Sequence, residues 1–554
     1  MSLRRSLSWF TIFVGLVLSA RAQTIVLTPS STNIGSTGGT LTFTATITYT
    51  SNPSVLAFSA TLPAGWTYLS GNNEPQVKPA AGTTGELGWV YTTAVPASPA
   101  TFTFTASYPA GLNGLQPLTT QTVTRATVES APVTTSGPSV VISAPATAFT
   151  WTTNATGNWN DPTKWSPTGT VPNNSGNSTY SAQIDSGTVT VPSATTITVN
   201  ELLLLGGTIN GAGSLNLAGT ASSWSDGAFA SLALLTIQSG AQLTVSANKA
   251  HDFDATAIVN RGTVRWTDGG DLRSGNGGSF INVQGATFID ATTSGNDRVI
   301  SNQFGGDFTF TNAGTYTKNV AGSTTRIAIP FFNSGDIRID AGTIRFASTF
   351  IQNSGSLRIA SGAVGSFDTT LAFTAGTLNG DGTVKGNATI GVSNAGTPRS
   401  IAPLTSGTTA VISPGDTLGR LTIDGNLTLL ATSKLLIDLG GTTQGVNYDF
   451  LSVTGNAALG GTLEINFTNG FAASASPSTT FTVVTATTLT GAFANVPISG
   501  TRLLTNDGVS SFLVNYTANS VTLTNFVPIP EPSTWALMIA GLGVLALGAW
   551  RKKK

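Results

Sequence analysis

Apolar and polar residues alternate along much of the chain, with the period of two that is typical of a half-buried β-strand. The alternation is unbroken from Thr40 to Tyr49 and returns over residues 102–105, and turn residues rich in Gly, Asn and Pro separate such segments. This pattern predicts a β-sandwich of short strands over residues 23–130. Residues 131–148 are rich in Pro, Ser and Thr, which predicts a linker.

A second pattern begins near residue 150, where a short motif recurs at intervals close to 20 residues. The motif is Asn-x-Gly, and it starts at Asn260, Asn312, Asn333 and Asn353. After each Asn, the fourth and sixth residues are apolar, apart from Lys318, and the fifth is polar. A turn followed by an inward, outward, inward strand is the repeating unit of a parallel β-solenoid.

Residues 149–405 are therefore predicted to form a parallel β-helix (solenoid) of roughly a dozen rungs. Stacked Asn side chains are expected to form a hydrogen-bonded ladder along it. A second sandwich is the alternative for this region, and the fixed period favours the solenoid.

Three segments resemble bacterial surface proteins. Residues 62–68, with the sequence LPAGWTY, are similar to immunoglobulin-like or cohesin-like modules. Trp151, Trp159 and Trp165 resemble the start of autotransporter-associated β-strand repeats. Residues 406–526 resemble the C-terminal part of autotransporter passenger domains, through the matching residues Ser413-Pro414-Gly415, Leu421-Thr422-Ile423-Asp424-Gly425, Tyr448-Asp449 and Gly460-Gly461-Thr462-Leu463.

These resemblances imply a β-rich C-terminal region after the solenoid. The three tryptophans could form a sugar-stacking platform or an aromatic cap over the first rung, and we expect the cap because a solenoid end must be shielded. Autotransporters require a long C-terminal set of membrane strands, whereas this chain ends in an apolar segment and lysines. Export is therefore expected to use a different signal.

The N-terminus, residues 1–22, has the features of a secretory signal peptide. Two arginines precede an apolar core, and Ala20 and Ala22 form an A-x-A cleavage site. Such a signal implies export through the Sec translocon. A membrane anchor is the alternative, but the apolar run is short for a span.

The C-terminal segment, residues 527–554, contains an uncharged run from Trp535 to Trp550 that predicts a single transmembrane helix. Four cations follow the run and predict a cytoplasmic stop: Arg551, Lys552, Lys553 and Lys554. Pro530, Glu531 and Pro532 precede it in an extended peptide that cannot be helical.

This order of a Pro-Glu-Pro box, an apolar helix and a basic tail resembles the PEP-CTERM sorting signal. The resemblance implies a Gram-negative exported protein that an exosortase-type membrane protease recognises and processes. Such a protein would be anchored in the inner membrane by its C-terminal helix and would then reach the cell surface or the extracellular space. Proteins of this kind occur in bacteria that make exopolysaccharide and biofilm matrix. A plain single-pass anchor is the alternative, and it leaves the Pro-Glu-Pro box unexplained.

Composition limits the chemistry available to the chain. The 25 Lys and Arg balance 25 Asp and Glu, so the sequence lacks the basic excess that a nucleic-acid partner requires. Seven of the cations lie in the two terminal segments and only one anion does, which leaves residues 23–529 with 18 − 24 = −6 charges. There is no Cys and a single His, so we expect no cofactor and no metal site built on those ligands.

Two clusters are candidates for binding or catalysis. His251, Asp252 and Asp254 could form an acid/base group on a polysaccharide-cleaving β-helix, although adjacent carboxylates in exposed β-structure are usually solvated. Arg265, Arg338 and Arg358 occupy equivalent repeat positions and could hold an acidic polysaccharide, or they could lie on an ordinary solvated face. We assign no catalytic residue.

The sequence thus predicts an all-β protein with a sandwich, a solenoid, a β-rich end and a C-terminal transmembrane helix. The expected function is that of a non-enzymatic structural or adhesive protein of the cell surface or matrix. The alternative is a polysaccharide lyase or hydrolase on the β-helix scaffold, with Asp252 and Asp254 as its candidates.

Overall fold

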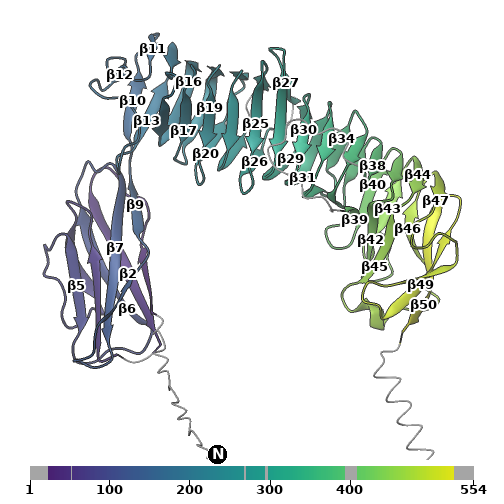
Figure 1. Cartoon of the computed structure of the whole chain (residues 1–554), viewed down its shortest axis with the longest axis horizontal. Coiled ribbons are helices and arrows are strands. Elements are labelled where there is room, and N and C mark those ends of the chain that lie inside the picture. The colour runs from purple at the N-terminus through teal and green to yellow at the C-terminus, as the bar shows by residue number, and fades with distance from the viewer. Residues whose placement is uncertain (1–22, 51–52, 268–269, 294–296, 393–408, 530–554) are drawn as a thin grey trace, which may run out of the picture. The chain divides into compact units, whose positions relative to one another are not determined.

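The structure is a computed structural model that describes residues 23–50, 53–267, 270–293, 297–392 and 409–529. Its regular elements are all β-strands apart from one turn of 3₁₀ helix, Phe471–Ala473, which confirms the predicted all-β class. The chain forms two compact units, one of residues 1–147 with 175–179 and one of the remaining residues. Each unit is described by itself (Figure 1).

The first unit is a sandwich in which all strands pair antiparallel. Its core contains the fully buried Phe43, Trp66, Trp89 and Phe104. One sheet has the order β1 (Gln23–Pro29), β2 (Gly39–Tyr49), β6 (Ala100–Tyr108) and β4 (Thr67–Asn72). The other has the order β5 (Glu86–Tyr91), β3 (Val55–Thr61), β7 (Gly114–Arg125) and β8 (Val133–Ser136), with β9 (Val140–Ala144) also paired to β7.

Residues 131–148 are not the predicted linker, because they contain β8 and β9 and begin β10. Both of the first two strands pair with β7 and so belong to the sandwich. Pro132, Pro138 and Pro145 fall between the strands, where a missing N–H removes no ladder hydrogen bond. The proline content therefore marks strand ends in this segment.

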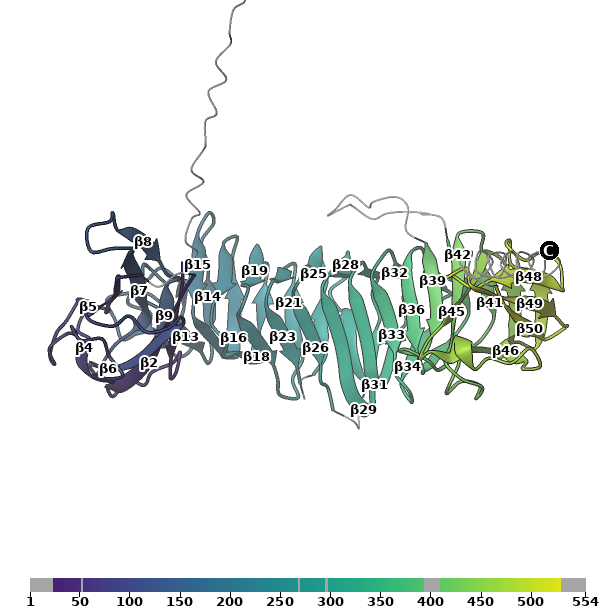
Figure 2. The same ribbon diagram turned by 90° about the horizontal axis from the view of Figure 1, so that it is seen from below.

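The second unit is a parallel β-solenoid, whose stacked rungs appear side by side in Figure 2. One sheet consists of thirteen strands: β15 (Thr196–Val199), β17 (Ser214–Leu217), β19 (Leu234–Ile237), β22 (Ala257–Asn260), β25 (Gly278–Asn282), β28 (Phe308–Asn312), β30 (Phe331–Asn333), β32 (Phe350–Gln352), β35 (Leu371–Phe373), β38 (Ala388–Ile390), β41 (Leu427–Leu429), β44 (Asn456–Leu459) and β47 (Thr488–Gly491).

The remaining strands form a second, larger sheet with more than one strand per rung: β10 (Thr147–Trp151), β11 (Thr156–Asn158), β12 (Trp165–Ser166), β13 (Tyr180–Ile184), β14 (Thr188–Thr190), β16 (Glu201–Asn210), β18 (Ser222–Ala230), β20 (Gln242–Val245), β21 (His251–Asp254), β23 (Thr263–Trp266), β24 (Leu272–Ser274), β26 (Thr287–Asp290), β27 (Arg298–Asn302), β29 (Thr315–Ile327), β31 (Asp336–Phe346), β33 (Ser356–Ile359), β34 (Val364–Phe367), β36 (Gly376–Gly380), β37 (Thr383–Lys385), β39 (Ala410–Pro414), β40 (Arg420–Asp424), β42 (Ser433–Leu439), β43 (Phe450–Val453), β45 (Thr462–Phe467), β46 (Phe481–Thr485), β48 (Thr501–Leu504), β49 (Ser510–Tyr516) and β50 (Ser520–Pro528).

The register of the rungs confirms the solenoid and excludes a second sandwich for this region. Strands from successive rungs pair in parallel, so that Ile337 lies beside Tyr316 on one side and Leu357 on the other. All three side chains are buried in one continuous hydrophobic core. The apolar positions of the Asn-x-Gly repeat thus form its inward rows.

The solenoid does not end near residue 405. Strands β39 to β47 continue the same parallel pairings, and only β48, β49 and β50 add antiparallel partners at the end. Longer loops increase the spacing between equivalent residues to 30 in this part, as between Leu421 and Leu451. A search for a repeat of about 20 residues therefore misses these rungs.

No helix of the described part of the chain is both long enough and apolar enough to span a bilayer. The predicted transmembrane run Trp535–Trp550 and the predicted signal peptide lie outside the described residues.

Candidate functional site

The predicted acid/base cluster lies on β21, and strand alternation divides it between two faces. His251 and Phe253 are buried in the solenoid, whereas Asp252 and Asp254 are on the outward face. His251 Nε2 lies 3.1 Å from the carbonyl oxygen of Trp224 and 3.0 Å from that of Ser246. Because both partners are acceptors, Nε2 carries a proton and donates it. The side chain of His251 is therefore part of the buried interior and points away from the two carboxylates.

Burial lowers the pKa of His251, and the two backbone hydrogen bonds and nearby aspartates oppose this effect only in part. The imidazole also lies edge-on to the ring of Trp224, with 4.9 Å between ring centroids. A neutral, buried histidine packed on an aromatic ring has a structural role.

Asp252 and Asp254 share one face, as predicted, but both are held by side chains from the next rung. Arg273 Nε and Nη2 donate to the two oxygens of Asp252 at 2.7 and 2.9 Å. Asn276 Nδ2 donates to Asp254 Oδ1 at 2.9 Å. The hydrogen bond from Arg273 to Asp252 raises the pKa of Arg273. Both carboxylate oxygens of Asp252 are thus engaged in a bidentate arginine pair.

The three predicted arginines lie in one outward column of the larger sheet but are not all neighbours. Arg338 and Arg358 are partners on adjacent strands, β31 and β33. Ile289 and Thr317, one on each of two intervening strands, separate Arg265 from them. A row of three adjacent arginines is therefore not formed.

Arg358 is engaged by two aspartates. It forms ion pairs with Asp340 and Asp416, and its Nε lies 2.6 Å from Asp416 Oδ1. The hydrogen bond to Asp416 is the main reason why the pKa of Arg358 is raised. Asp416 is 58 residues away in the sequence, so the repeat pattern could not identify this partner. The positive charge at Arg358 is balanced locally and offers little to an acidic ligand.

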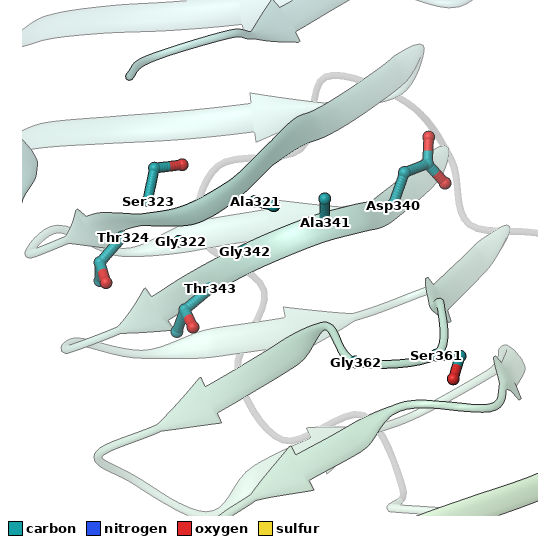
Figure 3. Close-up of a pocket in the computed structure, with 10 residues that line it drawn as sticks. All are labelled: Ala321, Gly322, Ser323, Thr324, Asp340, Ala341, Gly342, Thr343, Ser361 and Gly362. Carbon is teal, nitrogen blue, oxygen red and sulfur yellow. The ribbon is translucent and has the colours of Figure 1, made fainter. Parts of the chain in front are cut away.

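A depression of about 400 Å³ shares Asp340 with this ion-pair cluster, and Figure 3 shows the residues that line it. Small residues of β29 and β31 line it, including Gly322, Ser323, Gly342 and Thr343. The two strands are irregular here, and Gly342 adopts a φ of 74°, which favours glycine. Asp340, the charged residue of its lining, pairs with Arg358. Hydroxyl groups, glycine backbone and one carboxylate that is already paired thus line the depression.

The three tryptophans near residue 150 form the predicted aromatic cap. Trp151, Trp159 and Trp165 are fully buried, and Trp165 lies 4.9 Å from each of the other two, centroid to centroid. Their indole N–H groups donate to the carbonyl oxygens of Ala155, Pro172 and Trp159, respectively. Buried rings cannot stack on a sugar, so the platform hypothesis for these residues is wrong.

Asp449 is a titratable residue whose structural role the sequence did not indicate. Its two carboxyl oxygens accept hydrogen bonds from the backbone N–H groups of Gly419, at 3.0 Å, and Asp438, at 2.9 Å. Burial raises the pKa of Asp449 to about 8, despite these two hydrogen bonds. The side chain ties together two segments of the solenoid.

Comparison with known families gives a match to the PEP-CTERM protein-sorting motif over residues 528–554. This confirms the predicted sorting signal, whereas no family match confirms the autotransporter-like repeats. A comparison with curated proteins gives no match. The motif indicates an exported protein that is anchored in the membrane before an exosortase-type membrane protein processes it.

The matched range includes the predicted box Pro530-Glu531-Pro532 and the basic tail from Arg551 to Lys554. These residues, and the predicted cleavage residues Ala20 and Ala22, lie outside the residues that the structure describes. Their assigned roles remain predictions.

Proposed function

We propose that the exported chain is a non-enzymatic structural or adhesive protein of the cell surface or extracellular matrix, associated with exopolysaccharide. The main support is the outward face of the thirteen-stranded sheet. One column of side chains runs along this face from Thr198 on β15 to Thr490 on β47, with one residue from each strand. A regular, extended surface suits repeated contacts with a polymer.

The middle of the column is mainly apolar, with Thr311 between Ile281 and Phe332. Val259, Ile281, Phe332 and Ile351 are only partly buried there. Towards the end of the solenoid the same column carries Thr389 and Thr428. Partly exposed apolar groups can pack on the C–H faces of sugar rings, while the hydroxyl groups can form hydrogen bonds.

The contacts at the candidate catalytic cluster also favour this proposal over a polysaccharide lyase or hydrolase. Asp252 is held by Arg273, and His251 faces the interior. A glycosidase needs one carboxyl group as acid and a second as base or nucleophile. In this cluster the carboxyl group of Asp252 is already paired with Arg273.

The test uses the processed, exported chain and a panel of acidic and neutral exopolysaccharides. Co-sedimentation should retain the chain in the polysaccharide pellet, without new reducing or unsaturated ends. The double variant Phe332→Ser/Ile351→Ser should bind at least tenfold more weakly, while the control Thr389→Ser/Thr428→Ser, in the same column, should bind normally. Product formation that disappears in Asp252→Asn/Asp254→Asn would establish the enzyme alternative.

A further inference from the structure

A pair of opposite charges is completely buried inside the solenoid. Asp290 ends β26 and Lys318 lies on β29, and the two residues are direct partners on adjacent parallel strands. Both side chains are 0% exposed, and Lys318 Nζ lies 3.3 Å from Asp290 Oδ1. Lys318 is the residue that breaks the apolar inward row of the repeat, so its position in the core is specific to this rung.

Hydroxyl groups surround the pair on both sides. Tyr316 donates to Asp290 Oδ2 at 3.0 Å, and Thr292 donates to Asp290 Oδ1 at 2.8 Å. Lys318 Nζ also donates to Thr325 Oγ1 at 3.0 Å. These contacts fix both ends of the pair and direct two donors onto the carboxyl group.

Aromatic rings enclose the cluster. Tyr316 stacks on Phe288, with 4.9 Å between centroids, and contacts Phe310 and Phe331 edge-on at 5.9 Å. An ion pair in such a site bears a desolvation cost that the attraction between the charges offsets only in part. Condensation of the amine with the carboxyl group would remove both charges and leave a neutral amide, which is less costly to bury.

We propose that Lys318 and Asp290 are joined by an intramolecular isopeptide bond. Lys318 Nζ first gives one proton to Asp290 Oδ1, and the neutral amine then attacks Asp290 Cγ. A new C–N bond forms and one C–O bond of the carboxyl group breaks. The nitrogen gives a second proton to the departing oxygen, which leaves as water, and the amide keeps the third. The condensation is redox-neutral and consumes no co-reactant.

Tyr316 is placed to assist this step. The Tyr316 hydroxyl group donates to Asp290 Oδ2, whereas Lys318 Nζ lies nearest to Asp290 Oδ1. The hydrogen bond from Tyr316 withdraws electron density from Cγ, the carbon under attack. Burial, together with the charge and hydrogen bond of Asp290, raises the pKa of Tyr316 well above its usual value. The hydroxyl group therefore keeps its proton and remains a hydrogen-bond donor to Asp290 Oδ2 throughout the step.

The bond would connect neighbouring rungs in a chain that contains no cysteine. It would close a loop between residues 290 and 318, as a disulfide does in other exported proteins, and so restrict the unfolded chain.

The chain contains a matched pair that serves as an internal control. Lys434 on β42 and Glu464 on β45 also join adjacent strands, and their closest N–O distance is 2.6 Å. Their side chains are 29% and 31% exposed, so water stabilises both charges. The proposal predicts that Lys434 and Glu464 remain an ion pair.

The experiment is peptide mapping of the denatured full-length chain after trypsin digestion. A linked Lys318 resists cleavage, so residues 299–326 should appear as one peptide joined to residues 274–298, lighter than their sum by the mass of one water. Cleavage after Lys434 should be complete. Formation of a succinimide at Asp290 gives the same mass loss within residues 274–298 alone, and it leaves Lys318 cleavable.

The wild-type map decides the question without any variant. Separate peptides ending at Lys318 would overturn the proposal, whether or not one of them has lost water. Among variants, Lys318→Met should abolish the linked species and Tyr316→Phe should reduce its fraction strongly. If Tyr316→Phe links as completely as the wild type, the role assigned to the tyrosine hydroxyl is wrong.

Discussion

At the scale of single residues, the solenoid interior depends on polar side chains that satisfy one another. Amide groups from five successive strands form a buried ladder: Asn260, Asn282, Asn312, Asn333 and Gln352. The side-chain nitrogen of each of the four asparagines donates to the amide oxygen of the next rung, at 2.6 to 2.8 Å. The repeat of hydrogen bonds along the axis holds the turns of neighbouring rungs in one register.

Replacing the middle member of the ladder should cost much more than replacing an exposed asparagine. Asn312→Ala removes the bonds to Asn282 and Asn333 and leaves both partners buried, so we expect a loss of about 3 kcal/mol in the free energy of unfolding. Urea denaturation followed by circular dichroism measures the loss. Asn319→Ala, on the exposed side of β29, is the control and should change stability by less than about 0.5 kcal/mol. Equal losses in both variants would show that the ladder has no special role.

The sequence predicted this ladder and three of its asparagines, but it placed the last member one residue too far along. The fourth repeat contains Asn353, whereas the side chain in the ladder is Gln352, the partner of Asn333. Gln352 is placed in the ladder by the backbone register, and Asn353 follows the end of β32. A motif search does not detect this one-residue shift. Asn353 keeps the same spacing to the following Gly and strand as the Asn of the other repeats.

The sequence did not predict the ion-pair partners of the candidate charged residues, for a different reason. Asp252 pairs with Arg273 and Arg358 pairs with Asp416, and these contacts depend on loop lengths between rungs. The repeat predicts which residues point outward, but the variable loops decide which of them meet.

At the scale of the elements, the solenoid resembles a one-dimensional stack whose two ends need protection. Trp151, Trp159 and Trp165 cover the interior of the first rung, and the antiparallel strands β48, β49 and β50 follow the last parallel strands. Each rung contacts mainly its neighbours, so damage at one end should remain local.

Removing one tryptophan of the cap tests this locality. Trp159→Ala leaves a large cavity beside Trp165, and we expect local destabilisation of about 4 kcal/mol. Hydrogen exchange should become faster in β11 to β18, while β40 to β46 keep their protection. Leu205→Ala is the control, because Leu205 lies on β16 nearby and is 41% exposed. Uniform loss of protection along the solenoid would contradict a stack of locally coupled rungs.

The boundaries of the elements were less predictable than their type. Alternation and the 20-residue period were sufficient to predict strands and parallel rungs, since both follow from which side chains must be buried. The end of the solenoid was not predictable, because the later rungs keep their inward rows, such as Leu435 and Ile437, but have longer loops. Similarly, prolines between β8 and β9 suggested a linker where the sandwich continues.

At the scale of the whole molecule, the zero net charge is a sum over unlike parts. The two terminal segments contain seven cations and one anion, and the body between them has a charge of −6. The sorting motif at residues 528–554 contains an apolar run and four of these cations. The last described strand, β50, ends at Pro528, where the matched motif begins.

The sorting box should therefore be separable from the fold. In a host that contains an exosortase, replacing Pro530, Glu531 and Pro532 by alanine should leave the tail attached and the chain in the membrane fraction. The body should fold normally, because the substitutions lie beyond the last strand of the solenoid. Intact-mass measurement and fractionation report processing, and hydrogen exchange reports the fold.

A matched control separates the box from a general effect of losing a glutamate and a proline. Glu129→Ala/Pro132→Ala changes the same residue types at exposed positions of the first unit, and this variant should be processed and released like the wild type. If the alanine triplet is processed normally, recognition depends on the apolar run and basic tail alone. If both variants remain in the membrane, the defect lies in export or folding, since Glu129 and Pro132 are outside the matched motif. The expected pattern, retention of the triplet and release of the control, assigns recognition to the Pro-Glu-Pro box.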